Sequence, residues 1–482
     1  MMDRRSFLLK STQAAVGASL AARTAPAAGS PETDANPRPN VIWLMADQWR
    51  AQALSCQGDP NARTPNVDAL ATQGVHFTNA VSGFPLCCPF RGSLLASRYP
   101  HHCVPGNNYG LPLEQQTIVT PLKQAGYQTA WIGKWHLDGF EEREGRSAKT
   151  HIITPERRRG FDYWAAYENN NSQYDCWVHG GAGKDAFQYR LPGYESDELT
   201  NLLIRYIGDR AAEAKNGRMK PFFAALSIQP PHDPYIAPPE FAARYNGSRL
   251  KLRPNVPPVA SVQEAARREM AGYYAMIENW DWNIGRIRAA LDKAGFAFNT
   301  HLVIFSDHGD LHGSHGQYRK RLPYEESIRV PLIIGGEQPL SAEGRHAGRV
   351  AALMNHVDIA PTTLGLCGIK KPAWMEGNDY SQYRLSKQSA PSEPDSAFLQ
   401  VVDPRGGNGN LNKPYRGIVT KDGWKYVCFE NTSWLLFNLN EDPYELVNLA
   451  HDRHYRAERK RLIARLRQWI AETRDNFAVP ED

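Results

Sequence analysis

One stretch decides the interpretation of this chain: Phe84-Pro85-Leu86-Cys87-Cys88-Pro89-Phe90-Arg91-Gly92-Ser93-Leu94-Leu95-Ala96-Ser97-Arg98. Two adjacent cysteines come first, and the residues after them are typical of the first turns of an apolar helix. Pro89 fits near a helix start, because its missing N–H would have no partner there. Helix N-termini concentrate positive potential, so a reactive group at Cys87 would suit chemistry on an anion. The alternative is that both cysteines are unreactive thiols packed in the core.

The first 29 residues resemble a twin-arginine export signal. Arg4-Arg5 is followed by Phe7-Leu8-Leu9, by a mildly apolar segment, and by small residues at 25–29 that suit cleavage. A disordered cytosolic tail is the alternative. Residues 30–39 are rich in proline and polar residues and are expected to be a linker. No run of about eighteen apolar residues occurs elsewhere, so we expect no stable membrane span and a periplasmic or secreted protein, exported by the twin-arginine machinery.

Composition narrows the class further. Of 482 residues, 41% are hydrophobic and 22% charged, which is typical of a globular protein with one large core or two domains. The formal net charge is +5, and the predicted signal holds four positive charges and one negative, so +2 remains after its removal. That is too little to indicate a nucleic-acid partner. The seven cysteines lack metal-ribbon spacing, and their odd number argues against a disulfide scaffold.

Continuous apolar runs predict strands buried on both faces, at 40–48, 128–133, 221–228, 301–307 and 330–334. Helical spacing is found at 196–215, 262–294 and 356–366. The fold class is therefore α/β, with a large, mixed, mostly parallel sheet sandwiched by helices. Between the second strand and about residue 200 the chain is rich in Gly, Asn, Tyr and charge, and we expect long loops over the functional edge. The run Arg157-Arg158-Arg159 in that region fits a solvated face better than an anion site.

A polar segment at 373–395 marks the expected domain boundary. Beyond it, short strands are predicted at 397–402, 416–420, 424–429 and 434–439, followed by a basic helix at 452–473. These elements indicate a small antiparallel sheet covered by one helix. The expected organisation is an export signal at 1–29, a linker at 30–39, a catalytic domain at 40–375 and a C-terminal subdomain at 376–482.

Four predicted strands deliver ionisable groups at their carboxyl ends, where ligands bind in open α/β sheets. These groups are Asp47, Lys134 with His136, His232, and Asp307 with His308. This convergence predicts a metal site, with Asp47 and Asp307 as hard oxygen ligands and Gln48 and His308 as neutral ligands. For Asp47 alone, capping of the following helix is the alternative.

The spacing Cys87-x-Pro89-x-Arg91, followed by Ser93-Leu94-Leu95-x-x-Arg98, resembles the signature of the type I sulfatases of the alkaline phosphatase superfamily. The resemblance extends from residue 40 through the C-terminal subdomain and implies the alkaline phosphatase-like fold. It also implies that a formylglycine-generating maturation enzyme oxidises Cys87 to Cα-formylglycine. Cys88 then occupies a variable position of the signature and stays a thiol.

The same resemblance implies a divalent cation, usually calcium, bound by Asp47, Gln48, Asp307, His308 and residue 87. Many members carry Asp and Asn where this chain has Gln48 and His308. Because imidazole favours softer metals, manganese or another transition ion is an alternative to calcium, and magnesium is left open as well.

By resemblance, residue 87 is the nucleophile that attacks sulfur, and His136 is the base that allows sulfate to leave. Arg91 and Lys134 stabilise the aldehyde hydrate and the bound sulfate. His232 and Lys320 hold the sulfate and assist the leaving group. The catalytic set is therefore Cys87, Arg91, Lys134, His136, His232 and Lys320, and the substrate-binding set is Lys134, His232 and Lys320.

The expected reaction is hydrolysis of sulfate esters, with N-sulfates included, on a sulfated carbohydrate such as a glycosaminoglycan fragment or another sulfated glycan. An aryl or choline sulfatase, a phosphonate monoester or phosphodiester hydrolase of the same superfamily, and an inert binding protein are the alternatives. His312 and His315 could line the site or make structural hydrogen bonds. His101 and His102 are expected to be structural or rim residues.

Overall fold

The computed structural model describes residues 38–143, 145–337, 346–385, 393–405 and 411–481. The predicted export signal and most of the predicted linker lie outside these residues, as does part of the expected domain boundary. From Arg38 onward the chain forms one compact unit. Within the described part of it, no helix is both long enough and apolar enough to cross a bilayer.

A ten-stranded sheet organises this unit, in the order β10-β2-β9-β8-β1-β7-β3-β4-β5-β6. Its central strand β1 pairs in parallel with β7 and β8, and β3 continues the parallel part. Strand β9 runs antiparallel to β8 and β2, and β4, β5 and β6 form an antiparallel edge. The strands are β1 (Asn40–Ala46), β2 (Val75–Phe77), β3 (Gln128–Lys134), β4 (Tyr163–Tyr167), β5 (Trp177–Gly180), β6 (Phe187–Arg190), β7 (Phe222–Ser227), β8 (Thr300–Ser306), β9 (Leu332–Gly335) and β10 (Gly348–Val350).

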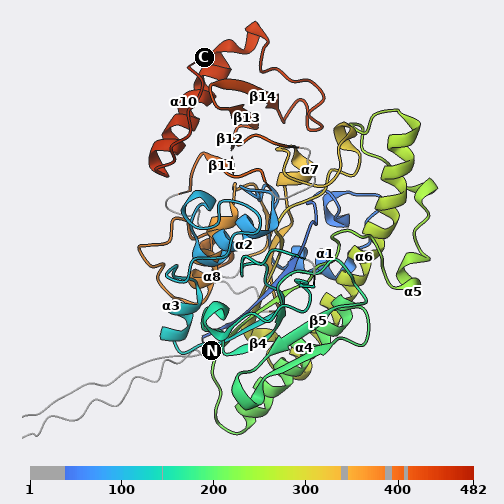
Figure 1. Cartoon of the computed structure of the whole chain (residues 1–482), viewed down its shortest axis with the longest axis vertical. Coiled ribbons are helices and arrows are strands. Elements are labelled where there is room, and N and C mark those ends of the chain that lie inside the picture. Colours follow the sequence, from blue (N-terminus) through green and yellow to red (C-terminus); the bar gives the residue numbers. More distant parts are fainter. Residues whose placement is uncertain (1–37, 144, 338–345, 386–392, 406–410, 482) are drawn as a thin grey trace, which may run out of the picture. The chain divides into compact units, whose positions relative to one another are not determined.

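Helices cover both faces of the sheet (Figure 1). One face packs against α1 (Pro65–Gln73), α4 (Glu195–Lys215) and α6 (Ala260–Lys293), and the other against α2 (Cys87–Ala96), α3 (Val119–Gln124), α8 (Ile359–Leu366) and α9 (Gln382–Leu385). Two further short helices are α5 (Pro239–Ala242) and α7 (Glu325–Ile328).

Strand β1 shows why the sequence forms a doubly covered sheet. All seven of its residues are buried. Because successive side chains point to opposite faces, Ile42 and Leu44 join the core beneath α4 and α6, whereas Trp43 and Met45 join the core beneath α2 and α8. A strand buried on both faces needs an apolar residue at nearly every position, which is the pattern seen in the sequence.

A second, four-stranded antiparallel sheet follows in the chain, with the order β11-β12-β13-β14. Its strands are β11 (Ser396–Val401), β12 (Tyr415–Thr420), β13 (Trp424–Phe429) and β14 (Thr432–Asn438), and α10 (Arg456–Glu472) lies along them (Figure 1). Leu462 and Leu466 of α10 pack against Phe398 and Ile418 of the sheet. The expected fold class, including the small antiparallel sheet with its helix, is confirmed.

One expectation about the fold was wrong. The region between β3 and residue 200 is not formed of long loops alone, because β4, β5 and β6 extend the sheet there. All four residues of β6 are exposed, so β6 lacks the continuous apolar run that identified the central strands, and pairing with β5 rather than burial defines it. By contrast, β4 is a short apolar run with four buried residues, a pattern that does indicate a strand.

Candidate active site

The predicted strand-end residues converge on one place. Asp47 directly follows β1, Asp307 and His308 directly follow β8, and Lys134 is the last residue of β3. Because these strands are parallel neighbours in the central sheet, their carboxyl ends meet at one edge. Cys87 is the first residue of α2 and is only 3% exposed.

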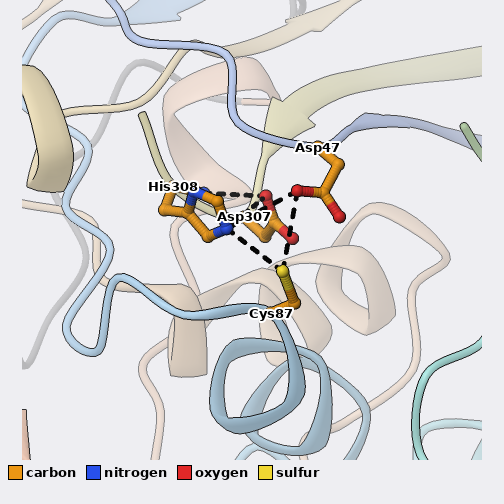
Figure 2. Close-up of side chains that lie close together, drawn as sticks. All are labelled: Asp47, Cys87, Asp307 and His308. Carbon is orange, nitrogen blue, oxygen red and sulfur yellow. Dashed lines mark hydrogen bonds and ion pairs between the residues drawn. The ribbon is translucent and has the colours of Figure 1, made fainter. Parts of the chain in front are cut away.

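Four buried side chains form a cluster that could hold a metal ion: Asp47, Cys87, Asp307 and His308 (Figure 2). One ligand atom of each lies within 4.8 Å of the others. Cys87 Sγ is 3.2 Å from His308 Nε2 and 3.6 Å from Asp47 Oδ1. Two carboxylates, an imidazole and residue 87 therefore surround a common centre.

The protonation states suit a cation. His308 Nδ1 donates to the carbonyl of Gly309 at 3.1 Å, which leaves the Nε2 lone pair toward Asp47 and Asp307, at 3.5 and 3.6 Å. Burial and the neighbouring charge of Asp47 raise the pKa of Asp307 to about 7. Two buried carboxylates that disfavour each other's charge would both be stabilised by a divalent ion between them.

Two cations stand on the other side of Asp47. Its Oδ2 accepts from Lys134 Nζ at 2.7 Å and from Arg91 Nη2 at 3.1 Å. Burial opposes ionisation of Asp47, but Lys134 and the nearby His232, Lys320 and His308 hold its pKa well below the usual range. Asp47 is therefore a carboxylate whose Oδ2 is occupied and whose Oδ1 points into the cluster.

Gln48 is oriented by a buried hydrogen-bond hub. Its Nε2 donates to Asp310 Oδ2 at 2.6 Å, and its Oε1 accepts from Lys320 Nζ at 2.7 Å. Asp310 also accepts from Tyr235 Oη at 2.5 Å and from the backbone N–H groups of His312 and Arg319, both at 3.0 Å. Because a carboxylate only accepts, Asp310 requires the NH₂ end of the amide on its side. The carbonyl end of Gln48 therefore faces Lys320.

Lys320 lies between Cys87 and His232. Its Nζ lies 2.7 Å from His232 Nε2 and 3.7 Å from Cys87 Sγ. His232 Nδ1 donates to the carbonyl of Asp233 at 2.7 Å, so Nε2 carries the lone pair that accepts from Lys320. Burial, followed by the charge of Lys320, lowers the pKa of His232 to about 4.

His136 has a neutral ring with one unpartnered nitrogen in the described structure. Burial, followed by the charges of Lys134 and Arg91, lowers the pKa of His136 well below its ordinary value, so the ring is neutral near pH 7. Its Nδ1 is buried and has no hydrogen-bond partner among the residues that the structure describes. The backbone of His136 has a φ of 55°, a left-handed conformation that L residues adopt rarely and that often marks functional positions.

A cavity of about 170 Å³ lies beside Cys87. Leu86 is the only purely hydrocarbon side chain in its lining, and aromatic rings other than histidine are absent from that lining. The lining residues are Leu86, Cys87, Asn107, Lys134, His136, Asn169, Asn171, His232, Asp233, Arg319, Lys320 and Arg321.

The remaining histidines named from the sequence lie outside the four-residue cluster. His312 packs between the rings of Tyr235 and Tyr273, and His315 stacks on Tyr324 with ring centroids 3.9 Å apart. His101 bonds to Gln400 and to the Thr473 carbonyl, and His102 bonds to Glu376, as expected for structural residues. Cys88 is buried in the core.

The expectation for the arginine run holds only in part. Arg158 is 8% exposed, not solvated, and donates to the backbone carbonyls of Ile153 and Gly181. Arg157 is 37% exposed in its side chain and pairs with Asp138.

A second group with metal-ligand chemistry, His315, Glu326 and Glu445, lies away from Cys87. Arg253 Nε lies 2.6 Å from Glu326 Oε1, and a second cation, Lys425, is fully buried beside Glu445. Its Nζ lies 2.6 Å from Glu445 Oε1, 2.7 Å from Glu325 Oε1 and 2.9 Å from the Pro323 carbonyl. Three acceptors satisfy the three ammonium protons, so we assign this group to structure.

Sequence reasoning missed Asp310, Asp233 and Arg319, which surround Gln48. Asp310 lies in the glycine-rich segment after β8, two residues after His308, and Asp233 lies beside His232, so both are close in sequence to predicted site residues. Position in the loop does not reveal which side chain turns back toward Gln48, and only the folded loop provides that information.

The fold and the site together define the class: an α/β enzyme with a metal-capable cluster and a cysteine-headed helix at the carboxyl ends of a parallel sheet. Comparison with known proteins narrows it. The family model for sulfatases matches residues 39–369, and that for the C-terminal part of N-sulphoglucosamine sulphohydrolases matches residues 313–472.

Individual proteins agree with these matches. The chain is 36% identical to an ulvan-active sulfatase of Formosa agariphila, over 92% of this chain and 84% of that one. A protein solved in complex with its substrate D-glucosamine-2-N,6-O-disulfate superimposes with a TM-score of 0.78 at 25% identity, covering 91% of this chain and 99% of that one. A phosphonate monoester hydrolase of Agrobacterium radiobacter shares the fold, with a TM-score of 0.72 at 24% identity over 90% and 96% of the two chains.

This chain belongs to the sulfatase family, whose members hydrolyse sulfate esters. The resemblance inferred from Cys87, Pro89 and Arg91 is thereby confirmed, and so is the expected enzyme class.

Proposed function

We propose that this sulfatase removes sulfate from a sulfated carbohydrate, with residue 87 in its Cα-formylglycine form and a divalent cation at the four-residue cluster. The observation that carries the carbohydrate part is the lining of the cavity beside Cys87, which is built from amides and charged groups. Asn107 Oδ1 and Asn169 Oδ1 are buried there without a hydrogen-bond partner among the described residues. Such acceptors suit the hydroxyl donors of a sugar, whereas an aryl group would need apolar walls.

Two relatives support the same substrate class. The Formosa agariphila protein is named for its action on ulvan, and the structurally similar protein was solved with a sulfated glucosamine. We extend this class to the present chain because both comparisons span more than nine-tenths of it.

The donor set fits the cation. Asp47, Asp307, His308 and residue 87 would hold it. Gln48 Oε1, which accepts from Lys320 Nζ at 2.7 Å, would turn from that ammonium to become a further ligand, and we favour calcium because hard oxygens predominate. The bound cation would supply positive charge that polarises the sulfate ester and the nucleophile. In its formylglycine form, residue 87 supplies a hydrated aldehyde: one hydroxyl displaces the alcohol from sulfur, and the second lets sulfate leave.

The chain's own residues complete the chemistry. Lys134 and Arg91, buried together against Asp47, place positive charge next to residue 87 and stabilise the sulfate oxygens. His136 is neutral and has an unpartnered ring nitrogen, so it can accept the proton whose removal releases sulfate. Lys320 donates toward residue 87 and His232, which places an ammonium where the leaving oxygen needs a proton or a hydrogen bond.

A substrate comparison tests the proposal. Enzyme whose residue 87 has been shown by mass spectrometry to be formylglycine is assayed on sulfated monosaccharides and oligosaccharides, 4-nitrophenyl sulfate, choline sulfate, and the matched phosphodiester and phosphonate monoester. We expect the highest kcat/KM on a sulfated sugar. A strong preference for the phosphodiester or phosphonate would overturn the proposed reaction, and preference for the aryl or choline ester would overturn the proposed substrate class. The Cys87→Ala protein is the control for contaminating activity.

We also propose that residues 1–29 direct the chain to the twin-arginine machinery, so that it acts in the periplasm or outside the cell, where extracellular glycans are met. The Arg4-Arg5 pair and the small residues before residue 30 support this proposal. Replacing both arginines by lysine should retain the chain in the cytoplasm with its N-terminus uncleaved. Unchanged export of that variant would refute the assignment.

A further inference from the structure

A second polar cavity, of about 330 Å³, lies apart from the cavity beside Cys87, and the two share no lining residue. Its walls come from residues 50–61, residues 251–254 and residues 443–444, together with Tyr274 and Arg329. Its volume falls at the lower end of the range for small-molecule sites, about 300–1,000 Å³.

Positive charge dominates this lining. Arg50, Lys251, Arg253 and Arg329 face a single lining carboxylate, Asp59. Two of the four cations form ion pairs with carboxylates outside the lining. Arg253 Nε lies 2.6 Å from Glu326 Oε1, and Arg329 Nη1 lies 3.4 Å from Glu325 Oε2. The remaining two, Arg50 and Lys251, form no ion pair within the described part of the chain.

Arg50 is the unusual member. It is only 1% exposed, and its guanidinium makes one hydrogen bond in the described structure, from Nη2 to the Tyr274 hydroxyl at 3.3 Å. That hydroxyl donates in turn to Asp59 Oδ2 at 2.6 Å, so the nearest lining carboxylate is reached only through a neutral group. Burial opposes the charge of Arg50, but Tyr274, Tyr273 and Asp59 still raise the pKa of its guanidinium above the usual value, so the charge is compensated without a direct ion pair.

Further polar atoms lack partners at the same place. Arg50 Nε, Arg329 Nε and Gln52 Oε1 are buried without a hydrogen-bond partner in the described residues. The backbone N–H of Ala51 donates to the Arg329 carbonyl at 2.9 Å, which brings the segments that carry these three side chains together. Two cationic donors and one neutral acceptor suit a ligand that has an oxyanion and a hydroxyl group.

We propose that this cavity is a second anion-binding site, which takes the sulfate or carboxylate group of an acidic saccharide or a free sulfate ion. Arg50 and Arg329 contribute guanidinium groups to the lining, Lys251 adds positive charge at the exposed rim, and Gln52 is a neutral polar member of the lining. Glu326 pairs with Arg253 and Glu325 pairs with Arg329, so these carboxylates offset part of the positive charge when no anion is bound. The proposal does not depend on the reaction at Cys87, since no residue of that cavity takes part.

Location is tested in crystals of the full chain soaked in sodium selenate, a tetrahedral dianion whose selenium is identified by anomalous scattering. We expect a selenium peak in the cavity between Arg50, Arg329 and Lys251. Ordered water there, with selenium only beside Cys87, would overturn the proposal and would explain the unpartnered atoms by solvent.

Affinity is tested by calorimetric titration of the wild-type protein, the double variant Lys251→Gln/Arg329→Gln, and the control Arg268→Gln, which removes an exposed arginine from α6. Binding beside Cys87 is common to all three proteins, so differences between them report the second cavity. With sodium sulfate or a sulfated monosaccharide, the double variant should lose a binding step or bind at least about tenfold more weakly. Equal binding by all three proteins would refute the site.

The choice of ligand separates the two sources of the anion. Sodium sulfate, glucose 6-sulfate, glucuronate and glucose are titrated in parallel. Tighter binding of the acidic sugars than of sulfate identifies a saccharide site, whereas equal binding of sulfate and sugar sulfate identifies an ion site. Both results support an anion site, and binding of glucose as tight as that of the acidic sugars would contradict it.

Discussion

At the scale of single residues, the site depends on which end of each polar side chain faces the cluster. His308 is fixed by its Nδ1–H bond to Gly309, and Gln48 is fixed by the carboxylate of Asp310. Left-handed backbone recurs here, with φ of 71° at Gln48 and 70° at Arg319. The Asp310 carboxylate bonds to both residues, so one buried acid holds two strained positions in place.

Replacement of Asp310 by Asn tests this orientation. An Asn amide can donate or accept, so it no longer forces the NH₂ end of Gln48 to its side. We expect calcium binding to the metal-stripped protein, measured by calorimetry, to weaken by about 10- to 100-fold, as is typical when groups that orient metal ligands are changed.

The matched control is Glu269→Gln, because Glu269 bonds to Arg319 at 2.8 Å but not to Gln48. It should bind calcium nearly as tightly as the wild type. If Asp310→Asn binds calcium with unchanged affinity, Asp310 does not orient a metal ligand.

At the scale of elements, helix α2 presents residue 87 because it packs closely on its surroundings. A side chain at Gly92 would meet Val104 Cγ2 at 2.4 Å, so only glycine permits this approach. Phe90 on the same helix stacks on His356, the residue that begins the turn before α8, with ring centroids 5.1 Å apart. The position of Cys87 is therefore determined by contacts several residues along the helix.

His356 gives this contact a pH dependence. Its Nδ1 accepts from the Gly83 N–H at 2.9 Å, and burial lowers its pKa to about 3. The unfolded value is about 6.5, so the unfolded chain binds the extra proton between these pH values. The stability that neutral His356 contributes is present above about pH 6.5 and is lost as the pH falls toward 3, with a slope of about 1.4 kcal/mol per pH unit.

Urea unfolding between pH 4.5 and 7.5 measures this slope. His356→Gln should reduce this slope by up to about 1.4 kcal/mol per pH unit, the contribution of one proton. The wild-type slope is a sum of opposing contributions, because burial also lowers the pKa of His76 and of His179 to about 4 and raises the pKa of Glu168 to about 8 and of Asp358 to about 7. The difference between the two proteins therefore reports His356. Identical slopes in the wild type and His356→Gln would show that His356 is already charged, or not required, in the folded state.

At the scale of the whole molecule, the fold could be predicted where burial determines it. Strand β1 and strand β8 are buried at every residue, and their apolar runs revealed both their existence and the acids that follow them. Strand β6 could not be predicted, because its exposed residues are held by pairing to β5. Asp47, Asp307 and His308 could be predicted to lie together because each directly follows a buried parallel strand. The position of the Asp310 side chain could not be predicted, because it depends on the folded loop.

A buried ion pair links the small sheet to helix α7. Lys425 of β13 bonds to Glu325 of α7 and to Glu445. Replacing Lys425 by Met leaves the buried Glu445 without its cation and Glu325 with Arg329 alone, at 3.4 Å. We expect this change to lower the free energy of unfolding by about 3–5 kcal/mol.

The control for this change is Lys421→Met, which removes a 41%-exposed lysine paired with Glu393 at 2.7 Å. It should lower stability by less than about 1 kcal/mol, because exposed ion pairs contribute little. Urea midpoints compare the two variants. Equal effects would mean that the buried pair does not stabilise the link between the small sheet and α7.

The measurement that tests the account most directly relates turnover to the chemical state of residue 87. Preparations that differ in the fraction of formylglycine at residue 87, determined by mass spectrometry of the peptide containing it, are assayed on one sulfated sugar. We expect turnover to rise in proportion to the aldehyde fraction, and Cys87→Ala to be inactive while remaining folded. Full turnover by Cys87→Ala, or turnover independent of the aldehyde fraction, would contradict a sulfatase that works through residue 87.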